Sequence, residues 1–293
     1  MPVTDVENRL NEIANKVHRL PALPSVYHRV TELMNDPKSS AAEIGRVVSH
    51  DQAIAARLLN VINSSFYGFR QRINTVTRAM TMIGFRGLKE LLLALSVLPA
   101  MRDDSSGGPF DTRAFWTHAV GVAACARAAA GILRVPDPEA VFTTGLLHDI
   151  GKLGEYQFMR EEFLAVVETA HAENRPIHEV ERERFGFSHV DVGKILATKW
   201  QFPENIIEAI SMHHAPSRTA KFACQTGIVH LADIISRAKM MGEMYDGRVP
   251  PLDMNAWEAT GLKRSQIDPL MRATEEEFEK GKAFIAIVKE GAS

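Results

Sequence analysis

The chain has 293 residues, of which 45% are hydrophobic, and its 34 basic and 36 acidic residues give a formal net charge of -2. This length allows one large or two ordinary domains with a core that folds without external help. The near-neutral charge produces no global field, which argues against nucleic acid or an acidic membrane surface as a partner.

The N-terminus and the apolar segments favour a cytoplasmic protein. The first residues include acidic side chains and no apolar core segment, so they do not resemble a secretory signal. The longest apolar stretch, residues 91–100, is about half the length that a membrane span requires. Cys125 and Cys224 lack a CxxC spacing and are expected to be reduced packing residues. We therefore predict a cytoplasmic location and no membrane contact.

Helical periodicity extends through almost every segment, and no alternating pattern persists long enough to indicate a sheet. We predict an all-α fold in which an N-terminal helical subdomain, residues 1–104, packs on a helical core. In the subdomain, Ser39 or Ser40 with Glu43 resembles a capping box, Asp51 caps the next helix, and Gly84 separates the last two helices. The helices expected there cover residues 8–19, 25–35, 40–49, 52–63, 74–82 and 85–101.

A polar stretch at residues 105–110 is the expected linker to the core, residues 111–241. The helices expected in the core cover residues 111–133, 138–149, 160–173, 176–185, 189–200, 203–212 and 221–241. A C-terminal helical extension follows at residues 242–293, with helices at 253–260 and 265–290. Because the first two core helices are expected to form an antiparallel hairpin, we expect His118 to return beside His148.

The core contains an ordered set of potential metal ligands. Its members are His118, His148, Asp149, His189, His213, His214 and Asp233. Imidazole and carboxylate groups suit a borderline or hard divalent cation, and an aspartate flanked by ligands from several segments can bridge two ions. A lone histidine on an apolar helix face is more often a core residue, but the ordered group favours a binuclear hydrolytic centre. The ligand types do not distinguish iron, manganese, zinc and nickel.

Several motifs resemble the HD superfamily of metal-dependent phosphohydrolases, and more closely its HDOD branch of signalling output domains. The resemblance covers nearly the whole chain and implies an HD-type helical core. The motifs that carry it are Leu-Pro-Ala-Leu-Pro at 20–24, Val-Ser-His-Asp-Gln-Ala at 48–53, Leu-Leu-Asn-Val-Ile-Asn-Ser at 58–64, Ala-Met-Thr-Met-Ile-Gly at 79–84, Phe-Trp-Thr-His at 115–118, Gly-Leu-Leu-His-Asp-Ile-Gly-Lys at 145–152, His-Val-Asp-Val-Gly at 189–193 and Trp-Gln-Phe-Pro at 200–203.

The resemblance also implies roles for the candidate ligands. One ion would be held by His118, His148, Asp149 and Asp233. Asp149 would bridge to a second ion, held by His189 and by one or both of His213 and His214. Lys152 would reach a substrate phosphate, which makes Lys152 and Asp149 the candidate catalytic residues. This agrees with the chemistry of paired cations, which polarise a phosphoryl oxygen and lower the pKa of a shared water.

The resemblance implies a cytoplasmic, bacterial-type signal-transduction output or regulatory module that retains a binuclear metal site. The alternative is an active metal-dependent phosphohydrolase or phosphodiesterase that acts on a nucleotide or cyclic nucleotide. Many HDOD domains have degenerate metal ligands, whereas this chain keeps the full set. It differs from the HD-GYP relatives, because Ala215-Pro216-Ser217 follows the histidine pair and Ala114 stands where they often have a glutamate ligand. These differences argue against a trinuclear centre and against cleavage of cyclic-di-GMP.

The expected partners are a signalling protein that the sequence does not identify and a nucleotide ligand. Basic residues between Arg57 and Lys89 are interpreted as a solvated face, because no recognition helix or aromatic platform accompanies them. The aromatic turn at residues 64–69 has two interpretations, a partner anchor or burial between the subdomains. The pair His50-Asp51 imitates the His-Asp signature without companion ligands, so Asp51 is interpreted as a helix cap.

Overall fold

The computed structural model describes residues 3–19, 23–97, 109–242 and 249–290. All regular structure in these ranges is helical, which confirms the all-α prediction. Most of the expected linker, residues 105–108, lies outside the described residues. The domain boundaries that were expected from the sequence therefore stay a prediction.

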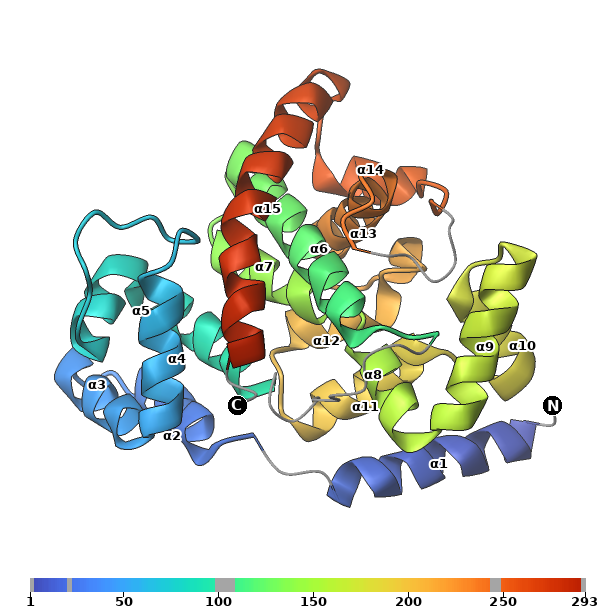
Figure 1. The fold of residues 1–293 in the computed structure, drawn as a ribbon, viewed down its shortest axis with the longest axis horizontal. Helices are drawn as coiled ribbons and strands as arrows, with labels where there is room; N and C mark the ends of the chain where they lie inside the picture. The colour runs from blue at the N-terminus through green and yellow to red at the C-terminus, as the bar shows by residue number, and fades with distance from the viewer. Residues whose placement is uncertain (1–2, 20–22, 98–108, 243–248, 291–293) are drawn as a thin grey trace.

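Four helices pack together into a lobe at the left of Figure 1. They are α2 (Ser25–Asn35), α3 (Ala41–His50), α4 (Gln52–Ile62) and α5 (Val76–Val97). The expected caps are present: Ser40 and Glu43 form a capping box at α3, and Asp51 accepts a hydrogen bond from the backbone N–H of Ile54 in α4. Gly84 breaks α5 with a φ of 76°, a left-handed backbone conformation that glycine adopts without steric cost.

The centre of the molecule is built around α6 (Thr112–Leu133), which packs against α7 (Pro138–Leu147), α13 (Ala223–Ala238) and α15 (Ile267–Glu290). Around this centre lie α8 (Ile150–Phe158), α9 (Arg160–Glu173), α10 (Ile177–Phe185), α11 (His189–Lys199), α12 (Glu204–Met212) and α14 (Met254–Thr260). Among the described residues, α6 is the one helix long and apolar enough to cross a membrane, and 72% of its apolar window is buried inside the fold. Its composition is explained by its place in the core.

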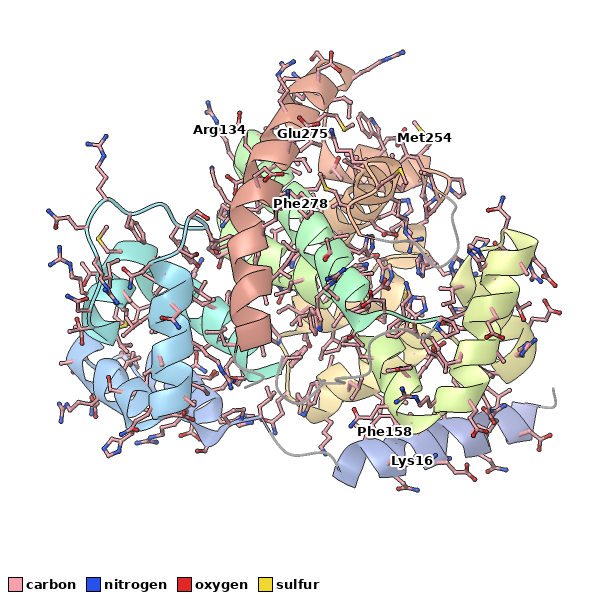
Figure 2. The ribbon with its side chains drawn as sticks, in the orientation of Figure 1. Lys16, Arg134, Phe158, Met254, Glu275 and Phe278 are labelled. Atoms are coloured by element: carbon pink, nitrogen blue, oxygen red, sulfur yellow. The ribbon has the colours of Figure 1, made fainter. Side chains whose placement is uncertain are left out.

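Helix α1 (Val3–Arg19) lies along α8 and α11 of the core, at the bottom of Figure 1. Figure 2 labels one of these contacts, in which the Lys16 ammonium donates a hydrogen bond of 3.0 Å to the backbone carbonyl of Phe158. At the opposite end of the chain, α15 runs along α6 and also contacts α4. Both terminal helices therefore cover the part of the fold that holds the candidate ligands.

The aromatic turn joins the N-terminal lobe to the core. Phe66 is 4% exposed, and its ring lies 4.9 Å from that of Phe142 in α7. The Arg127 guanidinium lies 4.0 Å from the centre of the Phe66 ring, a distance at which a cation is attracted to an aromatic face. The Tyr67 hydroxyl donates a hydrogen bond to Glu139 of α7. For Phe66, burial between the lobe and the core is the correct interpretation.

The helix expected over residues 138–149 is wrong at its C-terminal end. Helix α7 ends at Leu147, His148 and Asp149 form a turn, and a separate helix, α8, begins at Ile150. Asp149 has a φ of -101° and a ψ of 14°, which lies in the sparsely populated bridge region. The chain therefore changes direction at the His-Asp pair. Both residues belong to the corner between α7 and α8 and not to the surface of a continuous helix.

Gly151 explains how this corner is held against α11. A Cβ atom at Gly151 would lie 1.8 Å from the carbonyl oxygen of His189 and 2.7 Å from the backbone nitrogen of Gly193. The two backbones are thus in direct contact, and no side chain larger than hydrogen fits between them. This contact places the turn that carries Asp149 next to the first residue of α11, His189.

We expect Gly151→Ala to lower the free energy of unfolding by about 1–3 kcal/mol, because the added methyl group overpacks a contact between two backbones. Gly131→Ala is the matched control, since Gly131 is exposed in α6 and its added Cβ would meet nothing within 4 Å. The control should be as stable as the wild type, or more stable by up to about 1 kcal/mol. Urea unfolding followed by circular dichroism measures the free energy of unfolding of both variants. A Gly151→Ala variant as stable as the wild type would contradict the direct contact between the α8 and α11 backbones.

Candidate metal centre

All seven candidate ligands lie close together in the core, although they come from five separate segments. They are contributed by α6 (His118), the α7–α8 turn (His148 and Asp149), the start of α11 (His189), the end of α12 (His213 and His214) and α13 (Asp233). Six of them are at most 7% exposed, and His214 is half-buried. The expected return of His118 beside His148 is confirmed by ring centres 5.6 Å apart.

The carboxylate of Asp149 stands between two groups of imidazoles. Its Oδ1 atom lies 3.2 Å from Nε2 of His189 and 3.4 Å from Nε2 of His213. Its Oδ2 atom lies 3.3 Å from Nε2 of His148 and 2.5 Å from Nζ of Lys152. Two sets of ligand atoms suited to a metal ion share this residue, one with His118 and His148 and the other with His189, His213 and His214.

Asp233 lies with the first of these groups. Its Oδ1 atom is 3.0 Å from Nε2 of His118 and 4.0 Å from Nε2 of His148. Arg237, one helical turn further along α13, donates a hydrogen bond of 2.8 Å to the same oxygen. In the second group, Nε2 of His214 lies 3.0 Å from Nε2 of His189.

Hydrogen bonds on the far side of three imidazole rings fix which nitrogen faces the cluster. Nδ1 of His148 donates to the carbonyl of Gly145 at 2.7 Å, and Nδ1 of His213 donates to the carbonyl of Ile210 at 3.0 Å. Because a carbonyl oxygen only accepts, Nδ1 carries a proton in both rings, and Nε2 is the nitrogen that faces the cluster. Nδ1 of His189 lies 2.7 Å from Glu181. Such partners orient metal-binding histidines and increase their basicity.

Several buried atoms in the cluster have no hydrogen-bond partner. Within the described part of the chain they are both ring nitrogens of His118, Nε2 of His148 and His213, and Oδ1 of Asp149. Their contacts with neighbouring groups have distances near 3 Å but not the geometry of a hydrogen bond. Each unsatisfied buried polar atom costs about 1–3 kcal/mol, so five in one place indicate a missing ligand. Imidazole nitrogens and carboxylate oxygens are donors that borderline divalent cations accept, and the residues fit a metal ion.

The protonation states of three candidate ligands suit metal binding as well. Burial lowers the pKa of His118, and it lowers the pKa of His213 to about 4, so both rings are neutral at physiological pH. Burial alone would raise the pKa of Asp149, but the charges of His148 and Lys152 outweigh it and hold the pKa well below its usual range. Metal ligands must be deprotonated, and these side chains already are.

Two buried glutamates behind His189 were missed by the sequence analysis. Glu181 of α10 is fully buried and accepts hydrogen bonds from the backbone N–H and the ring of His189. Glu155 of α8 is also fully buried, and burial together with the adjacent Glu181 raises its pKa well above the usual value. No sequence spacing connects Glu181 with His189, because the contact crosses between two helices.

Lys152 is 4% exposed, and its ammonium is bound to Asp149. It neutralises part of the charge of the bridging carboxylate inside the cluster. A phosphate bound near Asp149 would also be near this ammonium, because the two groups are in contact. The structure thus places both candidate catalytic residues, Asp149 and Lys152, at the centre of the ligand set.

Three solved structures resemble this fold. A candidate phosphohydrolase of Shewanella amazonensis SB2B has a TM-score of 0.72 and 25% identity, with 92% of this chain and 97% of that chain covered. An HDOD domain protein of unknown function from Geobacter sulfurreducens has a TM-score of 0.71 and 25% identity, with 93% and 99% covered. A candidate signal transduction protein of Marinobacter aquaeolei VT8 shares the fold at a TM-score of 0.78 and 18% identity, with 98% and 66% covered.

Sequence comparison finds a similar protein and a family. An uncharacterized protein of Treponema pallidum (strain Nichols) is 24% identical over 206 residues, which are 69% of this chain and 39% of that protein. The chain thus spans less than half the length of this curated relative. The HDOD domain family model matches residues 20–216, which is more than half of the chain. The chain belongs to the HDOD domain family.

Proposed function

We propose that this chain is a cytoplasmic HDOD signal-transduction output module whose core binds two divalent cations. The observation that carries the metal proposal is the position of Asp149, whose two carboxylate oxygens face two different groups of imidazole nitrogens. A carboxylate in this position can bridge two ions. The regulatory role is the one that the HDOD resemblance implies, and its partner is a signalling protein.

The contacts support a specific distribution of ligands. His118, His148 and Asp233 would hold one ion together with Oδ2 of Asp149. His189, His213 and His214 would hold the other together with Oδ1 of Asp149. Arg237 donates a hydrogen bond to Asp233, and Glu181 is hydrogen-bonded to the ring of His189. Each ion would therefore have at least one ligand that is oriented by a second charged residue.

A second candidate function is hydrolysis of a phosphate ester, and the contact between Lys152 and Asp149 favours it. When bound, two cations would polarise the phosphoryl oxygen and supply an activated water. Lys152 would bind a phosphate oxygen and stabilise the negative charge that develops there. The similarity to the Shewanella candidate phosphohydrolase supports this activity. His214 is half-buried, whereas the other six candidate ligands are at most 7% exposed.

Metal analysis of protein purified without a metal-affinity column tests the binuclear centre. We expect about two divalent ions per wild-type chain, and at least one fewer in Asp149→Asn, because an amide removes the negative charge and one of the two equivalent acceptors. Asp51→Asn is the matched control, since Asp51 also follows a histidine but caps α4, a role that asparagine fills. Wild-type protein without metal, or Asp149→Asn with both ions, would contradict the proposal.

Replacing the carboxylate behind His189 should weaken metal binding. We expect Glu181→Gln to lower the affinity for one ion about 10–100-fold, because the amide polarises the His189 ring less than the carboxylate does. Competition with a metal chelator, read by absorbance, measures the affinity. Glu179→Gln in the same helix is the control, since Glu179 is exposed. Equal affinities in the two variants would exclude a role for Glu181 at the metal.

The two candidate functions are separated by turnover of bis(4-nitrophenyl) phosphate on the metal-loaded chain. For a hydrolase, Lys152→Met should lower kcat about 10²–10³-fold through loss of charge stabilisation, while the metal content stays the same. Lys194→Met, an exposed change on α11, should leave kcat unchanged. If the metal-loaded wild-type chain shows no turnover of this ester or of cyclic nucleotides, the proposal of a hydrolase is refuted and that of a signal-transduction output module is kept.

A further inference from the structure

Helix α10 presents one of its faces to the metal centre. His178 and Glu181 are three residues apart and therefore lie on the same side of the helix. Glu181 is fully buried and holds His189, whereas His178 lies one turn closer to the N-terminus of the helix and is half-buried. His178 thus lies between the buried ligands and the solvent, on a helix already fixed to the centre.

The ring of His178 is stacked on the ring of His214. The ring centres are 4.1 Å apart and the planes differ by 18°. His214 is the half-buried member of the seven candidate ligands, and its Nε2 lies 3.0 Å from Nε2 of the buried His189. The stacked pair therefore forms the solvent-facing side of the second group of ligands.

The chemistry of His178 suits a bound anion. An imidazole ring carries at least one N–H donor in either of its protonation states. The ring nitrogens of His178 make no hydrogen bond to another residue in the described part of the chain, so the donor is available. His178 also lies in the first turn of α10, where the helix dipole favours negative charge.

We propose that His178 is a substrate-binding residue of the metal centre, which donates a ring N–H hydrogen bond to an oxygen of a phosphate group bound beside His214. This inference rests on the proposed binuclear centre and names the ligand class that its open side accepts. The stack with His214 holds the His178 ring in one orientation, and the link from Glu181 to His189 holds its helix. His178 does not bind the metal; it positions the phosphate.

Binding of inorganic phosphate to the metal-loaded full chain, measured by calorimetry, tests this role. His178→Phe keeps an aromatic ring to stack on His214 but removes the N–H donor. We expect it to keep the wild-type metal content and to bind phosphate about tenfold more weakly, which is the typical effect of losing one hydrogen bond to a charged group. His178→Gln, which keeps a donor, should recover part of the affinity. His171→Phe, an exposed change on α9, should bind phosphate as the wild type does.

The outcomes separate this inference from the proposed function. A wild-type chain with two ions whose phosphate affinity is unchanged in His178→Phe would overturn the role of His178 and leave the binuclear centre intact. Loss of metal from His178→Phe would make His178 a metal ligand and would also overturn it. A wild-type chain that binds no metal would refute both proposals, and one that binds metal but no phosphate would refute the substrate-binding role alone.

Discussion

The ionised carboxylate of Asp149 is buried, and much of the core serves to hold it. Moving a charge away from water is costly unless other groups compensate for it. Lys152 lies against one oxygen, and three imidazoles surround the carboxylate at 3.2 to 3.4 Å. The imidazoles His148, His189 and His213 have their outer nitrogens already bonded, so their Nε2 atoms converge near Asp149. Two cations would complete this arrangement.

The backbone contact at Gly151 makes the arrangement possible. Because α8 touches α11 without an intervening side chain, the turn that carries Asp149 lies beside the first residue of α11. Helix α6 brings His118 to the same place from the middle of the fold, and α13 brings Asp233. The ligand set is therefore produced by helix crossings. A change in how α8 and α11 pack would alter the metal centre directly, which offers a physical route for regulation.

Much of the fold could be predicted from the sequence, because local rules decide helices and their caps. The capping box at Ser40, the cap at Asp51 and the break at Gly84 depend on neighbouring residues alone. The ligand types were also visible, since an ordered group of histidines and aspartates favours a metal site over isolated core residues. The corner at Asp149, the support from Glu181 and the stack of His178 on His214 were not predicted. Each depends on contacts between helices that are distant in sequence. The hydrophobic periodicity of one helix does not indicate which other helix packs against it.

The burial of six ligands and the partial exposure of His214 bear on both candidate functions, because they limit access to one side of the centre. The central claim is that Asp149 bridges two ions. Anomalous diffraction from crystals of the manganese-loaded chain tests it most directly. The account predicts two peaks about 3.5–4 Å apart, one beside each oxygen of Asp149. A single peak, or two peaks of which only one contacts Asp149, would contradict it.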